Sequence, residues 1–204
     1  MARPRKDKVG PDARTRIIDA FWSMLAEGPY DDVTVKGLAS KAQVNHNTIY
    51  RHFNSIEHVA TTAVSEIYSI EAAMQVLELF TRPELINEKH LAAQGLDERV
   101  DKVLLAIRSG SPLLMSTIQE AIKSCWMQIT GASWDKLADE TKLELSFILG
   151  GITSTLQSFR SVDDMLAAKA LATSRIGVAA RQTLAELARE ARQGPSIEPG
   201  EWAT

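Results

Sequence analysis

The segment Thr34–Phe53, TVKGLASKAQVNHNTIYRHF, constrains the fold most, because its pattern fits two short helices joined by a tight turn. Thr34 and Asn45 are residue types that favour helix N-caps, so a helix is predicted after each of them. Ile49 and Phe53 recur at a spacing of four, which places both on the inward face of the second helix. The other face holds polar and aromatic side chains that folding does not require. A short polar helix held at an angle by a partner helix has the geometry that enters a DNA major groove.

Composition and cysteine usage are those of an ordinary globular protein. With 204 residues, of which 45% are hydrophobic, the chain can form one large domain or a small domain joined to a larger one. Its single cysteine, Cys125, excludes an internal disulfide and indicates a reducing compartment. No signal-peptide pattern follows the basic N-terminus, and no apolar run reaches the ~18 residues that span a membrane. We therefore expect a cytoplasmic protein without a membrane partner.

Charge is distributed unevenly along the chain. The formal net charge is −3, but residues 1–60 contain nine Lys and Arg against seven Asp and Glu, whereas residues 61–204 contain fourteen against nineteen. A basic head on an acidic body fits a protein that contacts phosphates with one end only. We expect residues 1–10 to be a flexible basic arm that adds phosphate or minor-groove contacts; the alternative is a solvated terminus. The candidate contacts in this arm are Arg3, Arg5 and Lys6.

A first helix is predicted over residues 11–27. Asp12 favours the positive end of the helix dipole, and a Gly-Pro pair follows the last turn. Arg14 and Arg16 lie near the start of this helix and are expected to support the basic end. One stripe of apolar side chains predicts packing against the two short helices. This stripe consists of Ile17, Ile18, Phe21 and Leu25.

Four motifs follow one another from the first helix through the two short ones: I-I-D-A, G-P-Y-D-D-V-T-V, L-A-x-x-A and V-N-x-N-T-I-Y-x-H-F. Together they resemble the DNA-binding head of the tetracycline-repressor (TetR/AcrR) family. The last motif carries most weight, because it specifies most of the second short helix. The resemblance covers roughly residues 13–60 and does not extend by motif into the rest of the chain.

Several positions depart from the commonest pattern of that family. Gln43 stands in the turn where glycine is usual, and a left-handed residue without glycine costs about 1 kcal/mol. Asn45 and Asn47 replace serine and glycine, and Ile56 replaces lysine. The Asn-x-Asn-Thr form with isoleucine resembles a second subset of the family. The isoleucine removes one expected phosphate-binding lysine and makes the basic arm more important.

The residue types and the resemblance assign roles on the two short helices. His46 and Asn47 lie at the end that points into the groove, and Lys36 is placed to reach a guanine edge, so these three are candidate base readers. Gly37 allows either the backbone to approach DNA or a neighbouring helix to pack closely. The candidate phosphate contacts carry hydroxyl, phenol or basic groups. They are Thr34, Thr48, Tyr50, Arg51 and His52.

Helical periodicity continues beyond the head to about residue 193, and no convincing strand pattern occurs. Ser55 is expected to cap a connector helix over residues 56–80, and breaks are predicted near Gly110 and Gly131. The connector stripe consists of Val59, Ala63, Ile67, Ile70, Met74 and Leu77. These patterns predict an all-α fold in four parts. The parts are the arm (1–10), an N-terminal three-helix helix-turn-helix DNA-binding domain (11–57), a C-terminal helical regulatory and dimerisation domain (58–194) and a loose tail (195–204).

Two long helices are predicted at residues 134–160 and 161–193, the second with Ser161 as its N-cap. The first carries two apolar stripes, one through Leu145 and one through Phe147, which implies two neighbours. The pair would form a four-helix dimer interface with a second subunit or a hairpin packed within its own chain; the resemblance implies the dimer. The candidate interface residues are Leu145, Ile148, Ile152, Leu156, Ala172, Ile176 and Ala179.

The resemblance also implies an effector pocket inside the C-terminal helices, although the same residues would serve as plain core. A largely apolar lining suits a small hydrophobic or aromatic effector. No cofactor and no metal are expected, because the histidines at positions 46, 52 and 58 do not share a helix face. The candidate lining residues are Met115, Gln119, Ile122, Trp126 and Phe147.

These predictions converge on a homodimeric transcriptional regulator, a repressor released from a palindromic double-stranded DNA operator by a small effector. The alternative is a DNA-binding structural or partner-binding protein without a small ligand, and ligand-dependent release of DNA discriminates between the two. An all-α enzyme is not expected. Cys125 has no nearby histidine in the sequence, and Glu84, Glu88 and His90 have no ligand or catalytic spacing.

Overall fold

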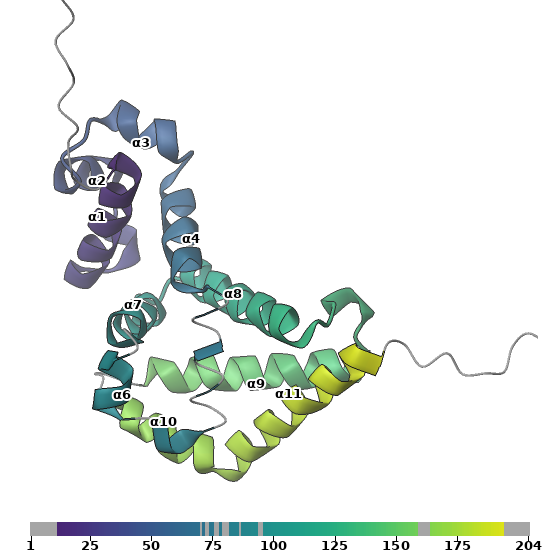
Figure 1. Ribbon diagram of the computed structural model, residues 1–204. Coiled ribbons are helices and arrows are strands. Elements are labelled where there is room, and N and C mark those ends of the chain that lie inside the picture. Colours follow the sequence, from purple (N-terminus) through teal and green to yellow (C-terminus); the bar gives the residue numbers. More distant parts are fainter. Residues whose placement is uncertain are drawn as a thin grey trace, which may run out of the picture.

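The computed structural model describes residues 12–69, 71, 74, 75, 78, 82–85, 87–93, 96–158 and 164–193. Every regular element within these residues is helical, and the all-α prediction is confirmed (Figure 1). A small head of short helices stands on a larger body of longer ones, and helix α4 leads from one to the other (Figure 1). The predicted basic arm, the C-terminal tail and the cap at Ser161 lie outside the described residues.

Local capping signals define the helices of the head. Asp12, Thr34, Asn45 and Ser55 each precede a helix, and each side chain accepts a hydrogen bond from the backbone N–H three residues later. Such caps satisfy N–H groups that the first helical turn leaves unpaired. The three predicted caps are confirmed, and the first helix begins at Ala13, two residues later than predicted. The head consists of α1 (Ala13–Glu27), the 3-10 turn η1 (Tyr30–Asp32), α2 (Val35–Lys41), α3 (His46–His52) and α4 (Ile56–Ile67).

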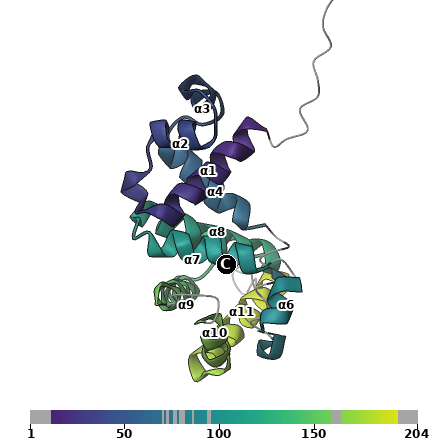
Figure 2. The same cartoon turned by 90° about the vertical axis from the view of Figure 1, so that its left-hand side faces the viewer.

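The body begins directly beneath the head. Helices α7 and α8 lie next to it, and α9, α10 and α11 lie farther away (Figure 2). The predicted breaks are confirmed, since Gly110 and Gly131 have φ of 70° and 77°, in the left-handed region that favours glycine. The described elements of the body are η2 (Pro83–Leu85), α6 (Glu88–Ala93), α7 (Leu96–Arg108), α8 (Pro112–Thr130), η3 (Trp134–Lys136), α9 (Asp139–Gln157), α10 (Asp164–Thr173) and α11 (Arg175–Gln193).

One hydrophobic core joins the head to the upper body. Ile17 and Phe21 of α1, Val59 of α4, and Leu114 and Ile118 of α8 are all fully buried in the same cluster. The apolar stripe predicted on the first helix is confirmed as part of it. Because packed cores transmit small displacements, a shift of α8 acts directly on α4.

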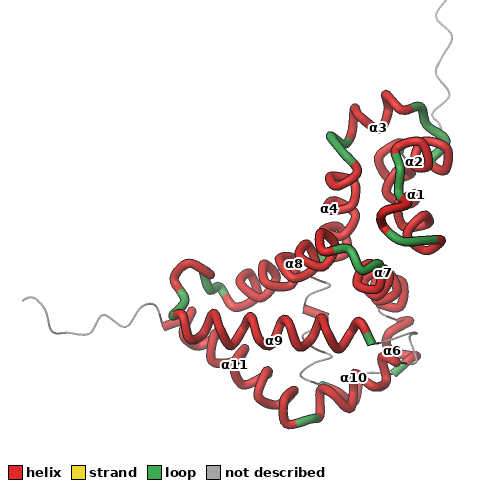
Figure 3. The backbone as a smooth tube through the Cα atoms, turned by 180° about the vertical axis from the view of Figure 1, so that it is seen from behind, coloured by secondary structure: helices red, strands yellow, loops and turns green. Residues whose placement is uncertain are grey.

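A second, smaller core lies at the far end of the body. Helices α9 and α11 converge there (Figure 3). Leu145 of α9 and Leu184 and Leu187 of α11 are buried together, with Trp126 and Trp134 packed against them. This cluster holds α9 and α11 together within one chain.

The connector helix is shorter than predicted. Helix α4 ends at Ile67, because the backbone of Tyr68 leaves the helical region with φ −95° and ψ 84°. The Tyr68 side chain packs against the shared core, so tertiary packing ends the helix where periodicity would continue it. Met74 is exposed, and Ile70 and Leu77 lie outside the described residues. The single long connector helix of the prediction is therefore wrong.

The late helices also differ from the prediction. Helix α9 begins at Asp139, after the separate 3-10 turn η3. The helix predicted over residues 161–193 is two helices, since Ser174 caps α11 by accepting a hydrogen bond from the N–H of Gly177 at 3.1 Å. A Cβ atom at Gly177 would lie 2.7 Å from the carbonyl oxygen of Ala172, so glycine permits the close turn between α10 and α11.

Candidate nucleic-acid interface

Helices α2 and α3 are joined by a turn that contains a left-handed residue. Gln43 has φ 53°, as predicted for this position. Its N–H donates to the carbonyl oxygen of Ser40 at 3.3 Å, and the N–H of Val44 donates to that of Ala39 at 3.0 Å. This pair of bonds is the Schellman arrangement that ends many helices, usually with glycine at the left-handed position.

Replacing Gln43 with glycine is expected to raise the free energy of unfolding by up to about 1 kcal/mol, because glycine adopts this φ without the penalty of a Cβ atom. The matched variant Gln43→Ala keeps the Cβ atom, and its free energy of unfolding should stay within about 0.5 kcal/mol of the original. Urea unfolding of the three proteins measures the difference. A glycine variant less stable than the alanine variant would contradict the left-handed conformation.

One face of α3 is buried and the opposite face is exposed at the tip of the head. Ile49 and Phe53 are buried in the shared core, as predicted. The predicted contact residues on the other face form one solvent-exposed surface, on which the Tyr50 side chain is 56% exposed. The exposed residues of this surface are His46, Asn47, Tyr50, Arg51 and His52.

The two threonines near this face differ in what their hydroxyl groups already bind. The Thr34 Oγ1 accepts a hydrogen bond from the N–H of Gly37 at 3.1 Å, which leaves its own proton for a phosphate oxygen. The Thr48 hydroxyl donates its proton to Asn45 Oδ1 at 3.0 Å, so a phosphate bond would require this cap to change. Thr34 is therefore the better prepared phosphate donor.

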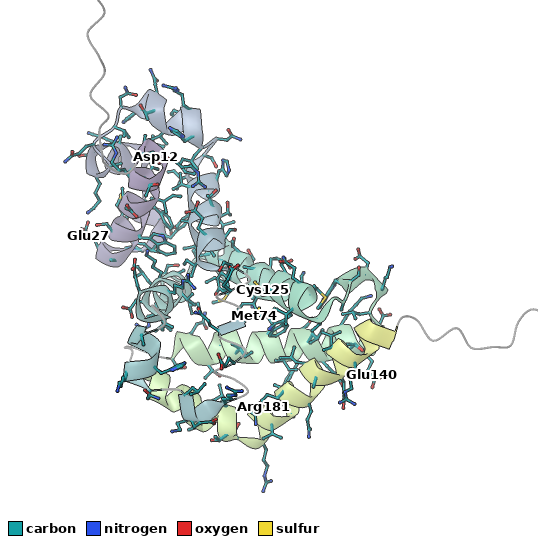
Figure 4. The ribbon with its side chains drawn as sticks, viewed as in Figure 1. Asp12, Glu27, Met74, Cys125, Glu140 and Arg181 are labelled. Carbon is teal, nitrogen blue, oxygen red and sulfur yellow. The ribbon has the colours of Figure 1, made fainter. Side chains whose placement is uncertain are left out.

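The two lysines of α2 differ in whether an acidic side chain already pairs with their charge. The Lys41 Nζ lies 2.6 Å from both carboxylate oxygens of Glu27, at the end of α1 opposite Asp12 (Figure 4). Lys36 is exposed and forms no ion pair among the described residues. Hydrogen bonding by the Thr15 N–H lowers the pKa of the Asp12 carboxyl group below its usual range, so the start of α1 carries a fixed negative charge. Lys36 is the lysine of α2 whose charge is available to DNA.

The C-terminal end of α3 is held by aromatic and charged contacts that were not predicted. The rings of Phe53 and His58 meet edge to face, with centroids 5.6 Å apart, and the His58 Nδ1 accepts a hydrogen bond from the N–H of Asn54. The Arg14 guanidinium lies 5.9 Å from the Phe53 ring centroid and pairs with the Glu66 carboxylate at 2.5 Å. The charge of Arg14 is thus paired within the head, contrary to the expectation that it supports the basic end.

Gly37 serves packing within the head. A Cβ atom at this position would lie 2.5 Å from the Cε and 3.1 Å from the Sδ of Met24, a residue of α1. Of the two predicted roles for Gly37, close helix packing is therefore the one that the geometry favours.

The residues predicted to line an effector pocket do not all lie together. Met115 and Ile122 pack against the shared core, and the Gln119 Nε2 donates to the Oγ1 of buried Thr153 at 3.3 Å, which links α8 to α9. Phe147 is 77% exposed, so its assignment to an enclosed pocket is corrected. A cleft of about 390 Å³ lies elsewhere, between α1, α4 and α7.

The residues predicted for the dimer interface also divide into groups. Leu145 and Ala172 are buried within the single chain, so their assignment to a surface for a second subunit is corrected. Ile148 and Ile152 are half-buried, and the side chain of Leu156 lies outside the described residues. The burial of Leu145 follows from its packing against α11, by which the chain covers one stripe of α9 itself.

The second stripe of α9 is the one that faces solvent. Leu143 and Phe147 on α9 and Ile176 and Val178 on α11 are large hydrophobic side chains with exposed surfaces. Leu143 and Phe147 lie one turn apart on one face of α9, whereas Ile176 and Val178 are two residues apart on α11 and point in nearly opposite directions. We call Leu143 and Phe147 the apolar surface. Ala179, one of the predicted interface residues, is exposed beside Val178.

Two short capped helices, a Schellman turn between them and an exposed polar face on the second define a helix-turn-helix DNA-binding domain. Residues 17–61 match the family model for bacterial regulatory proteins of the tetR family. Over 58 residues the chain is 33% identical to the HTH-type transcriptional repressor KstR of Mycobacterium tuberculosis (strain ATCC 25618 / H37Rv), an alignment that covers 28% of this chain and 26% of that protein. The match thus spans about a quarter of the curated relative.

A crystal structure of a TetR transcriptional regulator from Rhodococcus sp. RHA1 aligns with 81% of this chain and 95% of its own, at 21% sequence identity and a TM-score of 0.44. Residues 17–61 are thus similar to the DNA-binding domain of TetR-family transcriptional regulators, and the resemblance of the head to this family is confirmed. This family is not enzymatic.

Within the described residues, no helix combines the length and apolar character needed to cross a membrane.

Proposed function

We propose that this regulator is a homodimeric repressor, that its two α3 helices read a palindromic operator, and that a small effector releases it from DNA. The observation that carries the proposal is the exposed polar face of α3 at the tip of a head that shares its core with the body. Repression as the direction of control is supported by the similarity to KstR, which is a transcriptional repressor.

The geometry of the head supports the proposed contact roles. His46 and Asn47 lie in the first turn of α3 and read base edges, together with exposed Lys36 on α2. Phosphate groups are held by hydroxyl, phenol and basic side chains around them, of which Thr34 keeps a proton free. The other phosphate contacts are Thr48, Tyr50, Arg51 and His52.

The apolar surface supports a dimer. Two large hydrophobic side chains, exposed one turn apart on α9, favour a protein–protein contact over a solvated face. In a twofold dimer, each subunit contributes the same surface, so α9 and α11 of one chain meet α9 and α11 of its partner. The two heads then bind half-sites about one helical turn (~34–36 Å) or a multiple of it apart.

An effector acts on this dimer through helix α8. The proposed ligand is a small hydrophobic or aromatic molecule bound against the face of α8 that carries Met115, Gln119, Ile122 and Trp126. Because α8 and α4 share one core, a ligand that displaces α8 also moves the head. By thermodynamic linkage, DNA and effector must weaken the binding of each other by the same factor.

Selection of bound DNA from a random library tests the proposal most directly. The expected result is an enriched sequence with two inverted half-sites at a fixed spacing. Enrichment of a single half-site would contradict binding as a twofold dimer, and no enrichment at all would contradict sequence-specific regulation. Release of the selected DNA by small hydrophobic compounds then separates an effector-controlled repressor from a structural DNA-binding protein.

Replacing Arg51 with alanine is expected to weaken binding to all DNA sequences alike, because its exposed guanidinium is placed to hold phosphate. The slope of log K against log salt should fall by about 0.9 for each phosphate group that the variant no longer binds. Titration of operator and unrelated DNA at several salt concentrations measures both effects. Lys89→Ala, an exposed residue of α6 outside the head and outside the proposed dimer helices, is the matched control. A changed sequence preference with an unchanged salt slope would contradict the phosphate role.

A further inference from the structure

The end of helix α2 presents carbonyl groups that its own hydrogen bonds do not use. The Schellman pair occupies the carbonyl groups of Ala39 and Ser40, and the N–H of Ala42 occupies that of Leu38. The carbonyl groups of Ala42 and Gln43 follow them at the point where the chain turns towards α3. Unpaired carbonyl groups at a helix end require another donor.

Arg16 of helix α1 supplies this donor. Its Nη1 lies 3.1 Å from the carbonyl oxygen of Ala42 and 3.4 Å from that of Gln43. The Arg16 Nε is buried and has no hydrogen-bond partner among the described residues, so the guanidinium is committed to the turn despite one unsatisfied donor. A positive charge here also faces the negative end of the α2 dipole. Arg16 therefore acts inside the head rather than on its DNA-facing surface.

The orientation of α3 depends on contacts at its ends. The helix has only seven residues, a length at which a helix is not stable alone in water. At its N-terminal end, the turn contains the strained residue Gln43, held by Arg16. At its C-terminal end, Arg14 contacts the Phe53 ring and pairs with Glu66 of α4. Two arginines from one turn of α1 thus hold both ends of α3.

We propose that Arg16 is a positioning residue for DNA recognition: by binding the carbonyl groups of Ala42 and Gln43, it sets the angle at which α3 enters the major groove. Arg14 holds the opposite end of α3. The inference rests on the proposed reading of DNA by α3, but it assigns Arg16 no contact with DNA. Arg16 contributes geometry, whereas Arg51 contributes charge.

The first test uses the free protein. In Arg16→Ala, hydrogen exchange of the backbone amides at residues 43–49 is expected to accelerate by about tenfold or more, while the buried amides of α8 keep their rates. Such a local change reports the turn and α3 directly, without DNA. Unchanged exchange at residues 43–49 would overturn the positioning role.

The second test measures affinity per folded dimer, below the unfolding temperature of each variant. Affinity of Arg16→Ala for the selected operator should fall roughly 10- to 100-fold, as expected when hydrogen bonds to a charged group are removed. Affinity for unrelated DNA and the salt slope should stay unchanged, in contrast to Arg51→Ala. A salt slope that falls as in Arg51→Ala would show a phosphate contact by Arg16 and overturn the inference.

If the alanine variant does not fold, the variant Arg16→Lys tests the positioning role in its place. Lysine retains the charge but replaces the planar guanidinium, so operator affinity should fall by an intermediate factor with an unchanged salt slope. Full operator affinity in Arg16→Lys, together with unchanged exchange at residues 43–49, would overturn the proposal. If the original protein selects no DNA sequence, the proposed function fails; if it selects an operator that Arg16→Ala binds equally well, only the positioning role fails.

Discussion

Replacing Phe53 with alanine is expected to lower the free energy of unfolding by about 3–5 kcal/mol, the usual range for removing a fully buried phenylalanine side chain. Phe53 is 1% exposed and closes α3 against the shared core. Its ring also contacts His58 and Arg14, so the cavity would separate α3 from both α4 and α1. Urea unfolding followed by circular dichroism measures the loss, and specific DNA binding should disappear with it.

Tyr50→Ala is the matched control, because it removes an aromatic ring that is exposed on α3, whereas Phe53 is buried at the end of this helix. Tyr50 is exposed, so its loss should change the free energy of unfolding by no more than about 0.5 kcal/mol. The same change should weaken DNA binding, since Tyr50 belongs to the proposed contact surface. Equal losses of stability in the two variants would contradict the assignment of buried and DNA-facing sides to α3.

The head of the molecule was predictable because its signals are local. Thr34, Asn45 and Ser55 are short polar residues placed just before apolar periodic segments, and each cap forms within four residues of chain. Ile49 and Phe53 are buried because a spacing of four brings them to one face, whatever the rest of the chain does. Residue type and spacing alone are sufficient for features of this kind.

Helix ends in the body depend on contacts between distant segments, and the prediction failed there. Helix α4 ends where Tyr68 packs against a core that includes residues of α7 and α8. The break at Ser174 requires Gly177 to pass close to the backbone of α10, whereas alanine-rich periodicity on both sides favours one continuous helix. Neither ending has a proline, and the one local signal, the cap residue Ser174, lies within an alanine-rich periodic segment.

The candidate site shows the same difference between features set by local sequence and features set by distant contacts. The exposed residues of α3 were predicted from their face of the helix, but the partners of Arg16 lie 26 and 27 residues away in the sequence. Those partners are backbone carbonyl groups, which no residue type reveals. The only available signal was the left-handed turn at Gln43, which implied that a non-glycine residue there needs support.

Helix α9 carries two apolar stripes, and periodicity could not decide which of them meets the chain's own core. The structure decides it: Leu145 is 1% exposed against α11, whereas Phe147, two residues later, is 77% exposed. Two residues along a helix correspond to a rotation of about 200°, so the two side chains point in nearly opposite directions. The free stripe is therefore the one through Phe147.

Replacing Phe147 with aspartate is expected to weaken the proposed dimer by at least about 100-fold. An aromatic side chain at the centre of an interface commonly contributes about 2–4 kcal/mol, and a buried unpaired carboxylate adds a further penalty. Within the single chain, Phe147 is exposed, so the change leaves both hydrophobic cores intact. Dissociation should therefore occur without unfolding.

Sedimentation equilibrium over a range of protein concentrations measures this loss, with circular dichroism to show that the helices remain. The original protein should stay dimeric down to nanomolar concentration, whereas Phe147→Asp should be monomeric at micromolar concentration. Ser124→Asp, an exposed residue of α8 outside the apolar surface, is the matched control and should remain dimeric.

Operator binding gives the second measurement. A monomer carries one α3 helix and contacts one half-site, so the affinity of Phe147→Asp for the full palindrome should approach its affinity for a single half-site. An intact dimer in this variant would place the interface elsewhere. A monomer that still binds the palindrome as tightly as the original protein would show that the two heads bind independently, and the apolar surface would then have no part in operator recognition.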